Sequence, residues 1–109
     1  MIVATLELTI TFYATSLKDK RSVVKRVLGR VRNEFNVSAS EVDEHDNPGG
    51  AVLGFASVGH DKIYLEGQLT ALERFVDNLE LAEIVDVNRD YLVAGDGAVN
   101  DDDDDDDEG

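Results

Sequence analysis

Residues 16–35, SLKDKRSVVKRVLGRVRNEF, decide the fold of this chain because they combine an apolar stripe with most of its positive charge. On a helix of 3.6 residues per turn, the apolar side chains fall within an arc of about 100°. These side chains are Val24, Val27, Leu28, Val31 and Phe35. Ser16 followed by Asp19 is typical of a helix N-cap. The stretch therefore predicts an amphipathic helix that begins just after Ser16 and packs one face on a core.

The other side of the predicted helix is basic. Seven of the ten Lys and Arg residues of the chain lie in the stretch: Lys18, Lys20, Arg21, Lys25, Arg26, Arg30 and Arg32. Such a face is either a binding surface for a polyanion such as RNA or a solvated surface whose side-chain stems cover the apolar stripe. The candidate polyanion-binding residues are Lys18, Arg21, Lys25, Arg26 and Arg32. Gly29 leaves backbone exposed among them, where a partner could approach closely.

Alternating apolar residues predict four strands around this helix, at residues 2–12, 36–42, 51–58 and 82–93. In the second strand Val42 is out of phase, so we expect a bulge or strand end near Ser40 and Glu41. In the fourth strand the alternation runs through Val85, Val87 and Tyr91. A second helix is predicted from a cap at Asp61 to about residue 79.

The resulting order, βαββαβ, predicts an α+β fold of the ferredoxin-like type. Right-handed crossovers give a four-stranded antiparallel sheet of order 4-1-3-2 with both helices on one face. The second and fourth strands are then edges, and the length of the fourth makes it a candidate dimer edge.

The charge of the chain is unevenly distributed. The net charge is −14, and residues 95–109 contain nine acidic residues and no basic one. We expect one ferredoxin-like domain at residues 1–94 and a disordered acidic tail at residues 95–109. The tail could be a solubilising appendage, a competitor for polyanions at the basic helix, or an attractant for divalent cations or a basic partner. No cysteine or membrane-length apolar run is present, and we expect no signal peptide because the apolar residues at the N-terminus alternate and no basic region precedes them.

Four runs carry a family resemblance: SLKDKRSVVKRVL, FNVSASEVD, AVLGFASV and AEIVDVNRDYL. Over roughly residues 1–93 the chain resembles the YlxP-like family of small bacterial proteins, a domain of unknown function. The resemblance implies a ferredoxin-like fold, a cytoplasmic bacterial protein and a link to translation or ribosome maturation. It supplies no catalytic residues.

Few residues suggest chemistry. Asp43, Glu44, His45 and Asp46, with His60 and Asp61, could form a loose metal site, although the composition DEHDNPGG equally describes a solvated hairpin turn. No nucleophile, P-loop or dinucleotide motif is present, and we expect the apolar stripes of the helices to contain no ionisable group that could act as an acid or base. We therefore expect no catalytic residue, no metal site and no cofactor, and predict that the protein is not an enzyme.

Gly54, Phe55 and Ala56 partly match the third-strand pattern of RNA-recognition domains, which would place Phe55 on the open sheet face as a platform for bases. We instead expect Leu53 and Phe55 to point into the helix-covered core. The main hypothesis is thus a binding module that contacts ribosomal RNA or ribosome-associated proteins through its basic helix. The alternative is a homo-oligomeric protein-interaction domain that uses the edge of the fourth strand or a helix face, without nucleic acid.

Overall fold

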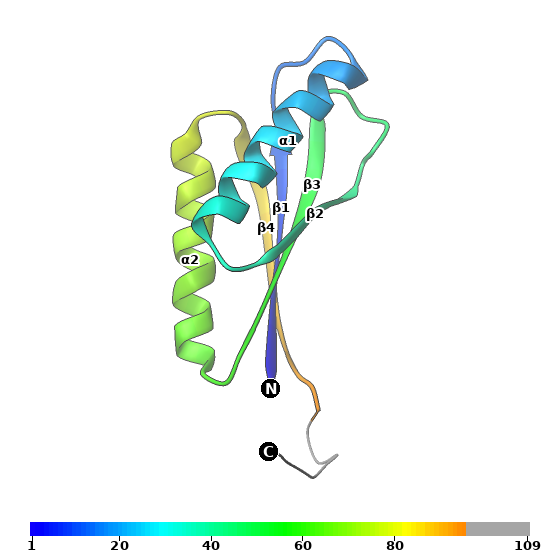
Figure 1. Cartoon of the computed structure of the whole chain (residues 1–109). Helices are drawn as coiled ribbons and strands as arrows, with labels where there is room; N and C mark the ends of the chain where they lie inside the picture. The colour runs from blue at the N-terminus through cyan, green and yellow to red at the C-terminus, as the bar shows by residue number, and fades with distance from the viewer. Residues whose placement is uncertain (96–109) are drawn as a thin grey trace.

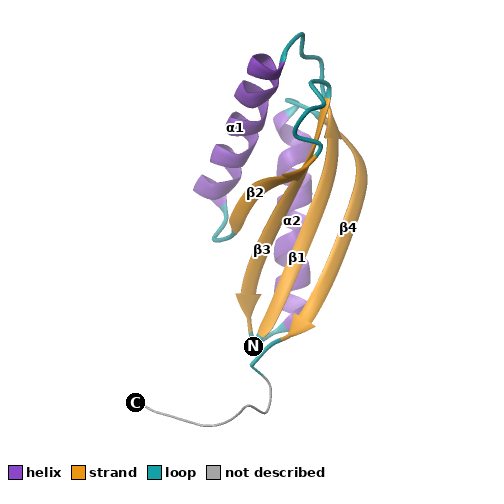
Figure 2. Cartoon of the chain, turned by 90° about the vertical axis from the view of Figure 1, so that its right-hand side faces the viewer, coloured by secondary structure: helices purple, strands orange, loops and turns teal. Residues whose placement is uncertain are grey.

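The computed structural model describes residues 1–95, and the predicted acidic tail beyond them lies outside the described residues. The elements follow in the order β1 (Ile2–Thr11), α1 (Leu17–Glu34), β2 (Ser38–Asp43), β3 (Gly50–Gly59), α2 (Lys62–Leu79) and β4 (Glu83–Val93). The strands form one antiparallel sheet in the order β2-β3-β1-β4, and the two helices lie against one of its faces (Figures 1 and 2). This arrangement confirms the predicted ferredoxin-like fold and its strand order.

The core lies between the two helices and one face of the sheet. Ala4, Leu6, Leu8 and Ile10 of β1 have no exposed surface, whereas the residues between them are partly or fully exposed. The predicted apolar stripe of α1 packs on this face, and Leu65, Leu69, Leu72 and Val76 supply the corresponding stripe of α2. Phe35, at the end of α1, meets Phe75 of α2 edge to face, with ring centroids 5.5 Å apart. Alternation with a period of two in β1 and of 3.6 in the helices thus defines a single core.

Both predicted helix caps are confirmed. The Ser16 hydroxyl accepts a hydrogen bond from the Asp19 backbone N–H at 3.2 Å, which satisfies one of the free donors at the start of α1. The Asp61 carboxylate accepts bonds from Ile63 and Tyr64 at the start of α2. These side chains fix where each helix begins and therefore which residues face the sheet.

Each edge strand contains an irregularity. In β2 the register shifts between Glu41 and Asp43, so Val42 is the bulged residue, next to the predicted position. In β4 the register shifts opposite Thr9 and Ile10, which leaves Val85 without a partner on β1. This second bulge was not predicted, and it removes Val85 from the expected alternation, so that Val85 is 53% exposed. Val87 and Tyr91 keep the predicted inward side, opposite Leu8 and Ala4, and Ile84 and Arg89 share that side.

Candidate nucleic-acid interface

The outward face of α1 carries the predicted basic residues. Lys18, Arg21, Lys25 and Arg26 are all exposed, and none of them forms an ion pair with any residue in the part of the chain that the structure describes. Lys18, Lys25 and Arg32 follow one another at intervals of seven residues, which places them on one line along the helix. That line is about 21 Å long at 1.5 Å per residue. The face therefore presents unneutralised positive charge to solvent.

Arg32 differs from the other four candidates because its side chain also forms a hydrogen bond within the protein. Its guanidinium donates a hydrogen bond to the backbone carbonyl of Ala39 in β2. The remaining N–H groups of the guanidinium are left for other acceptors. Because β2 is an edge strand, a cation bound to its backbone also hinders pairing with a foreign strand. Arg32 thus belongs partly to the fold and partly to the basic face.

Gly29 lies among these residues without a packing reason. A Cβ atom added at Gly29 would meet nothing within 4 Å, so the described part of the protein does not require glycine here. Glycine inside a helix costs about 1 kcal/mol relative to alanine. The helix therefore gives up stability at a half-exposed position among the basic residues.

Lys20 is the residue that sequence reasoning misplaced. It is only 1% exposed, so the expectation that the buried side of the helix contains no ionisable group is wrong. Lys20 precedes Val24 by four residues and Val27 by seven, and this spacing puts it in the middle of the buried arc. The signal was present in the sequence, but a buried lysine requires a partner that spacing along one helix does not reveal.

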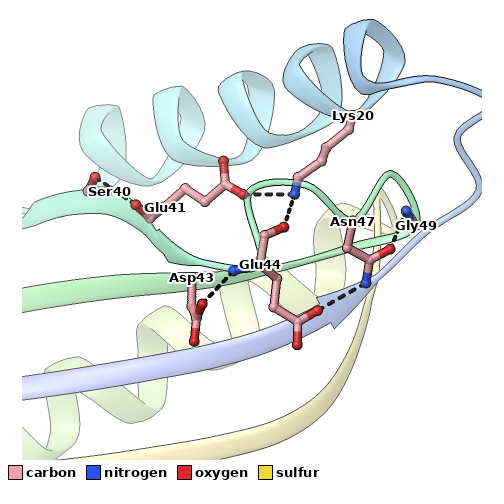
Figure 3. Close-up of polar contacts among 7 residues, drawn as sticks. All are labelled: Lys20, Ser40, Glu41, Asp43, Glu44, Asn47 and Gly49. Atoms are coloured by element: carbon pink, nitrogen blue, oxygen red, sulfur yellow. Dashed lines mark hydrogen bonds and ion pairs between the residues drawn. The ribbon is translucent and has the colours of Figure 1, made fainter.

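That partner comes from the β2–β3 hairpin. The Lys20 ammonium lies 2.9 Å from Glu41 Oε2 and donates a hydrogen bond to the backbone carbonyl of Glu44 (Figure 3). Glu41 Oε2 has no hydrogen-bond partner among the described residues, so its contact with Lys20 is an ion pair. Glu41 keeps 17% of its side chain exposed, whereas Lys20 is sealed. Lys20 therefore ties the first turn of α1 to the hairpin and is withdrawn from the basic face.

The acidic hairpin loop is ordered by its own side chains. Glu44 adopts a left-handed backbone conformation with φ of 62°, and its carbonyl also accepts the Asn47 N–H at 3.1 Å. The Asn47 side chain bonds the Glu44 carboxylate at 3.0 Å and the Gly49 N–H at 3.0 Å (Figure 3). Within residues 1–95 no group of three or more acidic or His side chains is arranged to hold a metal ion. The loop thus behaves as a structured turn, with His45 exposed and His60 at the far end of β3.

Phe55 does not offer a platform for bases. It is 2% exposed and Leu53 is fully buried, so both side chains point into the helix-covered core as predicted. Across the described residues, the opposite sheet face receives no aromatic side chain from the paired positions of the four strands. Within the described residues, the paired positions of the sheet therefore offer no aromatic ring on which a base could stack.

The fold and the basic helix define a small ferredoxin-like domain with a cationic face on its first helix. The chain belongs to the family described as "Protein of unknown function (DUF503)", which matches residues 2–89. It is 41% identical over 69 residues to the uncharacterised protein YlxP of Bacillus subtilis strain 168, a match that covers 63% of this chain and 75% of that protein. These findings confirm the YlxP-like resemblance, and the family itself has no assigned activity.

A solved structure agrees on the fold. A de novo designed protein with a ferredoxin fold matches with a TM-score of 0.55 and 17% identity, over 89% of this chain and 91% of that one. A candidate antibiotic biosynthesis monooxygenase from Deinococcus radiodurans covers 89% of this chain and 95% of its own, at 16% identity. Its TM-score of 0.46 is too low to support an inference about this chain. Neither helix within residues 1–95 combines the length and apolar character that a membrane span requires.

Proposed function

We propose that this protein is a non-catalytic binding module of the bacterial cytoplasm that docks on RNA phosphates, in the context of ribosome maturation, through the outward face of α1. The observation that carries the proposal is the set of exposed cations Lys18, Arg21, Lys25 and Arg26, which have no ion-pair partner within residues 1–95, in a chain of net charge −14. Lys and Arg side chains gain affinity for nucleic acid by releasing the counterions of the phosphates they contact. A local positive field can act in this way despite the overall charge, because screening limits electrostatics to about 10 Å.

Two features of α1 favour binding over a merely solvated face. Basic side chains that serve only solubility gain nothing from a glycine among them, yet the half-exposed Gly29 lies there at a cost to helix stability. Removal of the Cβ atom lets a phosphate or sugar come within contact distance of the helix backbone. Lys20 is held by Glu41 in the interior, so the cations of the basic face are side chains that reach solvent and can contact a phosphate.

The proposal of a non-catalytic role rests on how the buried charges are used. General acid–base catalysis requires an ionisable group held near a substrate with its proton available. Lys20, the buried charged residue of the core, is already engaged by Glu41 and by the Glu44 carbonyl. Its contacts are those of a structural tie between α1 and the β2–β3 hairpin.

A binding experiment with matched variants tests the proposal. Fluorescence anisotropy with a labelled RNA hairpin would compare the native chain with Arg21→Gln/Lys25→Gln, and also with Lys62→Gln/Arg74→Gln on α2, which loses the same charge. We expect about a ten-fold weaker affinity for the α1 variant, or roughly 1.4 kcal/mol, and little change for the α2 variant. Equal losses in both variants would reduce the effect to net charge, and no loss in either would overturn the proposal.

β4 favours a second candidate function, homo-oligomerisation through its free edge. It is an edge strand of 11 residues, whereas the other edge, β2, has six residues and is covered in part by Arg32. Uncovered edges of this length can pair with a second copy. Light scattering over a range of protein and salt concentrations tests this candidate, and a monomer under all conditions would contradict it.

A further inference from the structure

The sheet has one face that neither helix covers (Figure 2). The register assigns to this open face the odd-numbered residues of β1 and the residues paired with them on β3 and β4. On β2 it adds Ser38, Ser40 and Asp43. We refer to this surface as the open sheet face.

All charged residues at these positions are acidic. The register places five carboxylates there: Glu7, Asp43, Glu83, Asp86 and Asp90. Within residues 1–95 the paired positions bring no Lys, Arg or His to this face, because Arg89 of β4 points the other way and pairs with Glu73 of α2 at 3.1 Å. The open sheet face therefore has the opposite charge to the outward face of α1.

Three of the carboxylates lie close together. Glu7 pairs with Asn88, so Asp86 and Asp90 are its diagonal neighbours on β4, at a typical distance of about 7–8 Å. Like charges directly opposite each other destabilise a sheet, and these diagonal carboxylates repel one another more weakly over the longer distance. A cationic partner would remove this repulsion.

The same face also exposes apolar side chains. Val3 pairs with both Val58 and Leu92, so the three form one row across the sheet, and Val58 and Leu92 are 61% and 54% exposed. Beside this row lies a shallow hollow of about 320 Å³, bordered by Thr5, Glu7, Val42, Gly54 and Ala56. Val42 fills the space above Gly54, where an added Cβ would lie 2.8 Å from Val42 Cγ1. Val42 thus covers Gly54, and together with Ala56 these residues border the hollow.

We infer that the open sheet face is a docking surface for a cationic segment of another protein, one that carries Lys or Arg side chains for the carboxylates and apolar side chains for Val58 and Leu92. This surface is separate from α1 and does not depend on its proposed function. Charge complementarity selects the partner. RNA would bring phosphates against the five carboxylates, and a second copy docking through the same face would bring five more.

A second copy that docked through α1 would have the right charge but the wrong composition. Its outward face is composed of Lys and Arg, and its one large exposed apolar side chain is Leu17, in the first turn. It would therefore leave Val58 and Leu92 uncovered. The partner fits best as a basic segment of a different protein in which apolar residues alternate with the cations.

NMR amide shifts of the full-length protein test this inference. The probe is a twelve-residue peptide of repeated Lys-Leu-Ser, with Glu-Leu-Ser and Lys-Ser-Ser repeats as matched peptides. We expect the first peptide to shift the amides of Glu7, Val58, Asn88 and Leu92, the Glu-Leu-Ser peptide to shift none of them, and the Lys-Ser-Ser peptide to bind several-fold more weakly. Because each amide reports its own position, binding to residues 96–109 is recorded separately.

Variants make the test specific. Glu7→Gln/Asp90→Asn should weaken the affinity for the Lys-Leu-Ser peptide about five-fold, as expected for the loss of two exposed charge pairs. The isosteric Val58→Thr should weaken the affinity about two-fold. Glu66→Gln/Asp77→Asn on α2 removes the same charge and should change nothing. Peptide shifts confined to other surfaces, equal weakening by the α2 variant, or shifts of these amides by an RNA hairpin or by raised protein concentration would each overturn the inference. Failure of RNA to shift α1 would instead count against the proposed function.

Discussion

Lys20 and Lys25 lie five residues apart on α1 and have opposite roles. Lys20 is 1% exposed, lies 2.9 Å from Glu41 and holds the β2–β3 hairpin, whereas Lys25 is exposed and unpaired within the described residues. Five residues on a helix correspond to about 500°, so the two side chains point in directions roughly 140° apart. The comparison shows that basic residues of one helix can have different roles. Lys20 stabilises the fold, whereas the outward cations are available to a partner.

Removal of the Lys20 charge should have the largest effect on stability. Lys20→Met leaves Glu41 without its partner in a largely buried position, and we expect a loss of about 3 kcal/mol in the free energy of unfolding. Urea denaturation followed by circular dichroism would measure it. The double variant Lys20→Met/Glu41→Leu removes both charges and should recover most of that loss, because no unpaired charge remains. A loss below 1 kcal/mol for the single variant would contradict a structural role for Lys20.

The N-cap of α1 comes next in size, because it fixes the first turn that carries both Lys18 and Lys20. Ser16→Ala removes the acceptor for the Asp19 N–H and should cost about 1 kcal/mol. Ser16→Asp keeps an acceptor and should cost little. Thermal unfolding of the two variants would compare them, and equal melting temperatures would show that the cap contributes nothing.

Gly29 allows binding and stability to be separated on the basic face itself. Gly29→Ala should stabilise the protein by slightly under 1 kcal/mol, since an added Cβ meets nothing, and should weaken RNA binding if a partner approaches the backbone there. Gly67→Ala on α2 is the matched control, because its added Cβ also meets nothing within 4 Å. Both variants should unfold at higher denaturant concentration, but only Gly29→Ala should change the affinity for RNA. Identical RNA affinities would show that Gly29 has no part in binding.

Arg32 lies between the two classes of basic residue and should show the smallest effect. Arg32→Gln loses the bond to the Ala39 carbonyl at an exposed site, so we expect a destabilisation of about 0.5 kcal/mol. Arg32→Lys keeps the charge but loses the planar guanidinium, and should bind RNA nearly as well as the native chain. Hydrogen exchange at β2 would detect the loosened edge. Unchanged amide exchange rates at β2 in Arg32→Gln would show that Arg32 does not stabilise the edge strand.

The fold was predictable from the sequence because its signals are local. Alternation in residues 2–12, the caps at Ser16 and Asp61 and the bulge near Val42 depend on neighbouring residues, and they determine the order of elements. Lys20 was misplaced because its partner, Glu41, lies 21 residues further along the chain and is brought close only by the packing of α1 on the hairpin.

The acidic open sheet face could not be derived from the sequence for a related reason. Glu7 is recognisably outward from the alternation of β1, and Asp86 and Asp90 from that of Val87 and Tyr91. The bulge at Val85 reverses the side of Glu83, and the neighbours across the strands depend on the register. One extra residue in a strand reverses the side on which later residues point. Without that register, Asp86 and Asp90 could not be placed beside Glu7.

The salt dependence of RNA binding is the most direct test of the division within α1. The slope of log K against log salt counts the phosphates that a protein neutralises, at roughly 0.7–0.9 units for each one. Compared with the native chain, Arg21→Gln/Lys25→Gln should reduce that slope by about 1.5 units, whereas Lys20→Met/Glu41→Leu should leave it unchanged. A slope that falls equally in both variants, or in neither, would contradict the assignment of Lys20 to the fold and of the outward cations to RNA.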